Sequence, residues 1–373
     1  MLTERERLIL LNLIPEIGSA CLRRLLDAFG TLDRVWAAGV NELRQVPGIG
    51  PRLAQRIMEG CRDEPRLSRE LSLVQRAGVE IVTLNDPGYP MPLATISDPP
   101  LALYVRGTVK SDDAIAVGVV GARRASLYGL QAAERLSYDL ALRGITVVSG
   151  LARGIDAAAH RGALAVSGRT IAVLGSGLAR VYPPEHEELA ARVADHGAVL
   201  SEYPMETPPL PHNFPRRNRL ISGLSLGVVV VEAAQRSGAL ITADCALEQG
   251  REVFAVPGPV TSVTSQGTHR LLKQGARLVT SIEDILEELR LTERPARETA
   301  GFAERAETAP LPEPERRVFA CVEENCPQYI DTIATQSGLP TAEVSCILLQ
   351  LELKRLVQQL PGKQFVKTLE ARG

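Results

Sequence analysis

The stretch ITVVSGLARGIDAAAHRGAL, residues 145–164, decides the fold. It begins with a short apolar, β-branched run typical of a buried strand and ends in an alanine-rich run typical of a helix. Between them lies the glycine turn SGLARG, residues 149–154. Because a strand that passes at once into a helix is the repeating unit of α/β domains, this stretch predicts such a domain.

Five other stretches have the same apolar, β-branched character, and helical patterns separate most of them. They are AIAVGVVG (114–121), TIAVLGSG (170–177), GAVLSE (197–202), LGVVVVEA (226–233) and REVFAVPG (251–258). Near-continuous apolar strands that alternate with helices are typical of a parallel sheet covered on both faces. We therefore predict an α/β fold whose core, residues 76–290, is an extended Rossmann-like parallel sheet.

The segments on either side of this core have other patterns. Residues 1–75 carry apolar residues three and four apart, which predicts an N-terminal helical domain of the helix-hairpin-helix or SAM-like kind. Within it, VPGIGPRLAQRI (46–57) fits either a hairpin whose backbone N–H groups approach a phosphate or a plain tight corner between helices.

Residues 291–315 are rich in Pro, Ala and Glu, which predicts a flexible linker. Residues 316–373 follow an order of helix, helix, turn, helix and hairpin, which predicts a C-terminal winged-helix-like domain.

Composition limits the function classes. With 42 Lys and Arg against 44 Asp and Glu, the net charge is -2, so a nucleic-acid site must be a local patch. The six cysteines have neither a disulfide framework nor a metal-ligand spacing, which predicts reduced core residues and no metal site. A basic leader and an apolar run of about 18 residues are both missing. We expect a cytoplasmic protein without membrane contact.

The glycine turns also exclude several cofactors. Residues 175–180, GSGLAR, lack the third glycine of GxGxxG, and the chain has no GxxxxGK[ST] and no GxSxG. We therefore expect no nicotinamide, flavin or other cofactor, no P-loop chemistry and no serine nucleophile. His160 is interpreted as a packing residue of a helix rather than a catalytic one.

Polar turns follow the first three core strands, at residues 121–126, 149–154 and 175–177. The carboxyl ends of parallel strands lie at one edge, where loops enter helix N-termini that favour anions. Arg123 and Arg153 can add guanidinium groups to this edge. Asp156 fits either a carboxylate that orients Arg153 or an ordinary helix cap.

The segment HNFPRRNRLISGLS, residues 212–225, combines arginines, amides and one aromatic ring. This composition is typical of single-strand recognition, in which guanidinium groups contact phosphates and bases stack on a ring. The alternative is a solvated basic helix start. The candidate nucleic-acid contacts in this segment are Phe214, Arg216, Arg217, Asn218 and Arg219.

An enzyme remains an alternative. A nucleotide-hydrolysing Rossmann protein similar to a phosphoribohydrolase would need a carboxylate as general acid or base. Glu202 and Glu232, both at strand ends, are the candidates, and salt bridges to nearby arginines are their other interpretation. A duplex-DNA regulator acting through the C-terminal domain is less favoured, because AEVSCILLQLELKRL carries few basic side chains.

The core strongly resembles the DNA-processing protein A family (DprA, also called Smf). The motifs that carry the resemblance are GARRASLYG (121–129), SGLARGIDAAAHRGAL (149–164), AVLGSGLARVYPPEH (172–186), LSEYPMETPPLPHNFPRRNRLISGLS (200–225), VVVVEAAQRSGALITADCALEQGREVFAVPG (228–258) and QGTHRLLKQGA (266–276). The flanking domains follow the family's layout more loosely.

This resemblance implies a non-catalytic protein that binds single-stranded DNA without reading its sequence. It also implies a homodimer that loads the RecA recombinase onto incoming DNA during natural transformation, with single-strand-binding protein as a further candidate partner. The contacts that it implies, together with Arg217 from the arginine segment, are Arg123, Ser126, Ser149, Gly150, Arg153, Gly154, Phe214, Arg216, Asn218 and Arg219. Ala179 and His269 stand where the family commonly has Asp and Asn.

Overall fold

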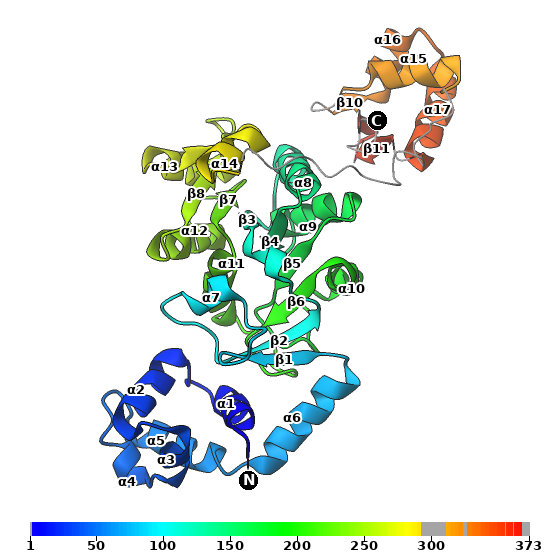
Figure 1. Ribbon diagram of the computed structural model, residues 1–373. Helices are drawn as coiled ribbons and strands as arrows, with labels where there is room; N and C mark the ends of the chain where they lie inside the picture. Colours follow the sequence, from blue (N-terminus) through cyan, green and yellow to red (C-terminus); the bar gives the residue numbers. More distant parts are fainter. Residues whose placement is uncertain (1, 292–310, 324–326, 355, 361, 368–373) are drawn as a thin grey trace. The chain divides into compact units, whose positions relative to one another are not determined.

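The computed structural model (Figure 1) describes residues 2–291, 311–323, 327–354, 356–360 and 362–367. The chain divides into two compact units, Met1–Arg297 and Glu298–Gly373. Most of the predicted linker, 291–315, lies outside the described residues, and helix α15 begins at Glu313. The domain boundary at residue 75 stays a prediction.

In the first unit, the helices alternate with strands from residue 80 onward. The strands are β1 (Glu80–Thr83), β2 (Ala102–Gly107), β3 (Ala116–Val120), β4 (Thr146–Ser149), β5 (Thr170–Val173), β6 (Ala198–Ser201), β7 (Gly227–Val230), β8 (Glu252–Ala255) and β9 (Arg277–Leu278). The helices are α1 (Glu4–Leu13), α2 (Ser19–Phe29), α3 (Leu32–Ala37), α4 (Val40–Leu43), α5 (Pro51–Gly60), α6 (Glu64–Arg76), α7 (Met91–Ala94), α8 (Leu127–Leu142), α9 (Ile155–Ala165), α10 (Glu187–His196), α11 (Asn213–Gly223), α12 (Gly238–Glu248), α13 (Gln266–Lys273) and α14 (Ile282–Glu288).

Within the described residues, these strands form one nine-stranded sheet in the order β1-β2-β6-β5-β4-β3-β7-β8-β9. Strands β6 to β9 of this order pair in parallel, whereas β2 pairs antiparallel with both β6 and β1. The prediction of a Rossmann-like parallel core is therefore confirmed for that part of the sheet. The antiparallel pair β1 and β2 extends one of its edges.

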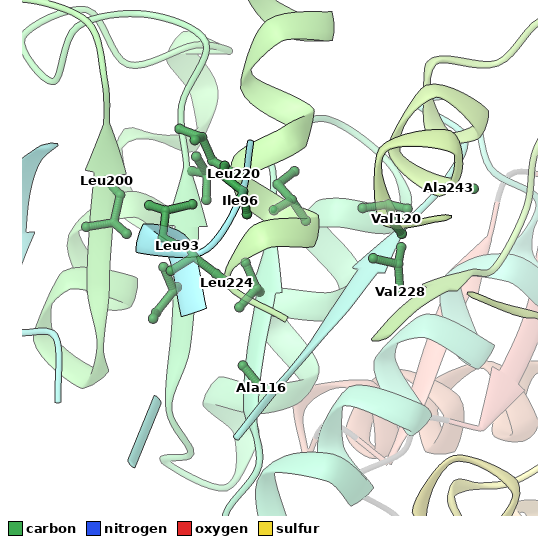
Figure 2. Close-up of a cluster of buried hydrophobic side chains, with 14 of the residues drawn as sticks. Leu93, Ile96, Ala116, Val120, Leu200, Leu220, Leu224, Val228 and Ala243 are labelled. Carbon is green, nitrogen blue, oxygen red and sulfur yellow. The ribbon is translucent and has the colours of Figure 1, made fainter. Parts of the chain in front are cut away.

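Helices cover both faces of the sheet because its strands are apolar on both sides. In β3, Ala116 and Val120 pack toward α7, α11 and α12, whereas Val117 and Val119 pack toward α8, α9 and α14. Figure 2 shows the first of these two cores, where Val120 and Val228 lie near Ala243 of α12. Because the side chains of a strand point alternately to the two faces of the sheet, each strand packs against a helical layer on either side. The loop after each strand therefore begins between two helical layers.

The N-terminal helices form their own core around Leu25, Leu43 and Ile57. Helix α1 is buried on more than one side: Leu8 and Leu11 join this core, while Ile9 and Leu10 join the core beneath β1 and β2. The first four residues of α1 are charged, and its apolar second half is buried between the two cores. It packs the helical layer directly against the sheet.

The second unit has the winged-helix order. Its elements are α15 (Glu313–Cys321), β10 (Gln328–Tyr329), α16 (Ile330–Ser337), α17 (Thr341–Leu353), β11 (Val357–Leu360) and β12 (Gln364–Lys367), with the strands in the order β10-β12-β11. On α17, Leu349 and Leu353 are exposed and apolar, and the residues from Thr341 to Leu353 include no Lys or Arg.

The cysteines only partly match the prediction of core residues. Cys21 and Cys61 are buried, but Cys346 is exposed, so the prediction is wrong for Cys346. Burial raises the pKa of the Cys61 thiol to about 12. Among the described residues, no group of three His, Cys, Asp or Glu side chains is arranged to hold a metal, and no helix is long and apolar enough to cross a membrane.

Candidate nucleic-acid interface

The strand order reverses at β3, which has β4 on one side and β7 on the other. In open α/β sheets, ligands bind at the carboxyl edge where the order reverses. A pocket of about 500 Å³ lies there. Loops after β3, β4 and β5, together with the starts of α11 and α12, line it.

Two of these loops interlock at Gly154. Its φ is +77°, and a Cβ at this position would lie 2.3 Å from the carbonyl oxygen of Ala122 and 2.8 Å from that of Arg123. The N–H of Ile155 donates to the Ala122 carbonyl at 3.2 Å. Only glycine fits both this backbone conformation and the close contact. Gly154 therefore joins the loops after β3 and β4.

Arg217 lies in the floor of the pocket and is buried. Its Nη1 donates to the carbonyl oxygen of Gly150 at 2.8 Å and to that of Val173. A Cβ at Gly150 would collide with both the Arg217 guanidinium and the Asp156 carboxylate. The glycine therefore makes room for this charged pair of side chains.

Burial disfavours both charges. It lowers the pKa of Arg217 to about 10, although the nearby Asp156 carboxylate acts in the opposite direction. It raises the pKa of the Asp156 carboxyl above its ordinary value, while Arg217 partly offsets this. Arg217 still carries its proton at neutral pH and places a positive charge beneath the pocket.

A row of two aromatic rings with a guanidinium group at each end, here called the ring row, runs along the rim. The Cζ atom of Arg123 lies 5.2 Å from the Phe214 ring centroid, the Phe214 and Tyr182 centroids are 5.7 Å apart, and Cζ of Arg153 lies 6.0 Å from the Tyr182 centroid. Glu185 accepts from Nε of Arg153 at 2.5 Å. Tilted rings beside cations are a geometry in which bases stack and phosphates bind.

The Phe214 ring is close to Gly175, whose Cβ would lie 2.9 Å from the ring. The glycine of the turn after β5 thus admits the ring into the rim. The sequence prediction missed Tyr182, although an aromatic residue among Gly, Arg and Pro in the turn after the third core strand was a usable signal.

The predicted serines have internal partners. Ser149 is buried, and its hydroxyl donates to the Val119 carbonyl at 2.6 Å. Ser126 caps α8, and both its N–H and its hydroxyl donate to the Glu232 carboxylate, at 2.8 and 2.5 Å. Ser126 is exposed at the rim. Their DNA contacts stay predictions.

The other residues of α11 lie in different places. Asn218 lines the pocket, and its Nδ2 donates to the Gly238 carbonyl at 3.2 Å. Arg216 is exposed in the first turn of the helix. Arg219 does not line the pocket; its Nη1 and Nη2 form a bidentate pair with Glu202 at 2.8 and 2.7 Å. The structure thus pairs the Arg219 guanidinium inside the protein and leaves Arg216 exposed.

The carboxylates considered for an enzyme have internal partners. Glu202 binds Arg219, and Glu232 accepts from Ser126 and from the Thr264 hydroxyl at 3.0 Å. His160 is buried, and its Nδ1 is 2.7 Å from the Thr170 hydroxyl, as expected for a packing residue. These contacts favour structural roles for all three residues.

The two departures from the family pattern also have partners. The N–H of Ala179 donates to the Met205 carbonyl at 3.0 Å, so backbone bonding orders this loop without a carboxylate. Nε2 of His269 is 3.0 Å from the Gly258 carbonyl oxygen. Neither residue lines the pocket.

The fold and this site define a class: a Rossmann-like α/β protein with a pocket lined by rings and arginines at its strand-order reversal. A helical domain precedes this core in the chain, and a winged helix follows it. The family model described as DNA recombination-mediator protein A matches residues 80–290. A SAM-like helix-hairpin-helix tandem matches residues 8–63, and a DprA winged helix domain matches residues 302–363. The chain belongs to the DprA/Smf family.

Relatives and solved structures agree with this assignment. The chain is 44% identical to Protein Smf of Escherichia coli over 326 residues, which cover 85% of each chain. The X-ray structure of DNA processing protein A from Streptococcus pneumoniae matches with a TM-score of 0.67 and 34% identity, covering 77% of this chain and 99% of the other. DNA processing protein A from Helicobacter pylori, solved to study its single-stranded DNA binding, matches with a TM-score of 0.51 and 31% identity, covering 57% and 96%.

Proposed function

We propose that this protein binds single-stranded DNA without reading its sequence, along the ring row and the adjoining pocket. The observation that carries the proposal is the row of Arg123, Phe214, Tyr182 and Arg153, two rings between two guanidinium groups, at the carboxyl edge of the sheet. Rings can stack any base, and guanidinium groups bind phosphates regardless of sequence. The single-strand binding named for the Helicobacter pylori relative supports the proposal.

The charge distribution supports a local site rather than general attraction to nucleic acid. The chain as a whole has a net charge of -2, yet exposed Arg123 lines the pocket and exposed Arg153 lies over the lining residue Tyr182. Exposed Arg216 directly follows Pro215, another lining residue. When an arginine contacts a phosphate, counterions are released from the nucleic acid. The slope of log affinity against log salt concentration should therefore be about -0.7 for each contact to a single strand.

The cellular role that we propose is loading of the RecA recombinase onto incoming single strands, as the family resemblance implies. In this role the protein acts as a homodimer, without catalysis or a cofactor, on strands covered by single-strand-binding protein. The names DNA processing protein and DNA recombination-mediator protein, given to the relatives and to the family, support a role in DNA processing.

The binding test is a fluorescence-anisotropy titration of a labelled thymidine oligomer and a duplex of equal length, repeated over a salt series. We expect preference for the single strand and loss of affinity in the double variant Arg123→Ala with Phe214→Ala. Equal binding of the duplex, or wild-type affinity of the double variant, would overturn the proposed function. RecA filament assembly on strands coated with single-strand-binding protein tests the loading role.

A further inference from the structure

The guanidinium of Arg219 is fully occupied inside the protein. Its side chain is 15% exposed, and Nη1 and Nη2 pair with the two oxygens of Glu202. Its Nε donates to the Asp98 carbonyl at 3.1 Å and lies 3.3 Å from the Asp98 carboxylate. Each nitrogen of this side chain thus has an internal acceptor. Bidentate hydrogen bonds between an arginine and a carboxylate are among the strongest hydrogen bonds in proteins.

Both acceptors are bonded in turn to the N-terminal helices. Ser19, the first residue of α2, donates from its hydroxyl to Oδ1 of Asp98 at 2.7 Å. Asn12 of α1 donates from Nδ2 to the Glu202 carbonyl at 3.1 Å. Ser19 is 5% exposed, so water competes little for its bond. The Asp98 carboxylate therefore joins α2 to Arg219, whereas α1 is bonded to the backbone of Glu202, the residue whose side chain holds Arg219.

Apolar packing links the same segments. Leu93 and Ile96, which precede Asp98, lie against Leu220 of α11 and against Leu224, the C-cap residue of that helix, in the cluster of Figure 2. A Cβ at Gly223 would lie 2.9 Å from the Leu93 side chain, which shows how closely this segment approaches the helix. The segment 93–98 is therefore packed on α11 and bonded to α2 at the same time.

We propose that Arg219 is a positioning residue: through Asp98 and Glu202 it couples the N-terminal helices to the helix that carries Phe214, Arg217 and Asn218. The inference rests on the proposed single-strand binding and goes beyond it, because it gives the N-terminal helices an influence on affinity. Arg219 itself contacts no phosphate. Although burial alone lowers the pKa of Arg219, Glu202 and Asp98 raise it overall, so Arg219 keeps its positive charge.

Asp98→Asn and Glu202→Gln separate positioning from direct contact, because the two roles predict opposite signs. If Arg219 bound a phosphate, removal of a competing carboxylate would release it and tighten binding. If Arg219 positions α11, each variant loosens that helix, and affinity for a thymidine oligomer falls about tenfold. The slope of log affinity against log salt stays at the wild-type value, since no phosphate contact is lost.

Ser19→Ala tests the connection to α2. It should weaken oligomer binding about threefold, whereas Ser68→Ala, at an exposed position of α6, should leave it unchanged. Hydrogen exchange of α11 amides should increase in Ser19→Ala and not in Ser68→Ala. A merely structural role of Ser19 would lower the melting temperature while the folded variant bound with wild-type affinity, and that result would overturn the proposal.

The controls distinguish this proposal from the function beneath it. Wild type and Phe214→Ala are measured in the same salt series. If wild type fails to bind the oligomer, or Phe214→Ala binds like wild type, the proposed function is wrong. If Phe214→Ala weakens binding while Asp98→Asn and Ser19→Ala tighten it or leave it unchanged, only the coupling is wrong. Because these two substitutions are conservative, the outcome does not depend on whether Arg219→Ala folds.

Discussion

The two arginines on opposite faces of α11, Arg217 and Arg219, have different partners. Arg217 faces the pocket, where its acceptors are mainly backbone carbonyls and burial lowers its pKa to about 10. Arg219, two residues on, faces Asp98 and Glu202, and their carboxylates hold its pKa above the ordinary value. The hydrogen bonds of Arg217 go to neutral carbonyl groups, with Asp156 as a neighbouring charge, whereas Glu202 holds Arg219 in a bidentate pair that neutralises it locally. Proximity in sequence therefore says little about which arginine attracts an anion.

The largest expected effect is on stability and concerns Arg217→Met. The substitution leaves the buried Asp156 carboxylate without its neighbouring positive charge, which should cost about 3–5 kcal/mol of unfolding free energy. Urea denaturation at neutral pH measures it. Arg216→Met is the matched control, because Arg216 is exposed on the same turn, and its cost should stay within about 0.5 kcal/mol. Equal losses in both variants would remove the distinction between the pocket face and the surface.

The next effect is on binding and concerns the two rings. Phe214→Ala and Tyr182→Ala should each weaken affinity for a thymidine oligomer by about 1–3 kcal/mol without changing the salt slope, because stacking carries no charge. Anisotropy titrations at several salt concentrations measure both quantities. Tyr329→Ala, an exposed tyrosine of the second unit, is the control. Wild-type affinity of Tyr182→Ala would restrict the site to Phe214.

The pH dependence of stability also distinguishes Arg217 from Arg219. Arg217 is among the charges that lower the pKa of the buried His160, whereas Arg219 is not. Burial and then nearby positive groups place this pKa at about 3, below the ordinary value of 6.5. Between these values the unfolded chain binds a proton that the folded chain does not. Stability should therefore fall as the pH drops from about 6.5 toward 3, by up to about 1.4 kcal/mol per pH unit.

Urea midpoints between pH 7 and pH 4 test this dependence. In His160→Gln the curve should be shallower than in wild type, since the glutamine cannot take up the proton. Curves of equal slope would show that His160 is charged in the folded state.

The smallest effects concern the exposed end of the ring row. Arg153→Ala should flatten the salt slope by about 0.7, the value of one contact to a single strand. Glu185→Gln removes the carboxylate that occupies Arg153 and should tighten binding by less than about threefold, because exposed ion pairs are weak. Arg277→Ala, at the far strand β9, serves as control. A slope unchanged in Arg153→Ala would limit the phosphate contacts to the Arg123 end.

The sequence was sufficient for the parts of the fold that depend on local pattern. Strands β3 to β8 lie within the six apolar stretches, because buried parallel strands are apolar on both faces. The two-residue strand β9 gives too short a pattern to detect, and the antiparallel pairing of β1 and β2 depends on contacts between distant segments.

For the site, the sequence placed the glycine turns and Phe214 at one edge but could not assign partners. That Arg219 would meet Asp98 and Glu202, and that Tyr182 would lie beside Phe214, follows from long-range packing. The sequence RRNR, residues 216–219, predicts neither of these contacts. A residue's type suggests what it can bind, whereas its neighbours in space decide what it does bind.

The contact at Gly154 has a consequence for the entropy cost of binding. Because the loops after β3 and β4 are already held together in the folded chain, a nucleic-acid strand that binds at this rim does not have to order them. The entropy cost of ordering the loops is met when the chain folds. The binding site is therefore preorganised, and more of the contact energy remains as affinity.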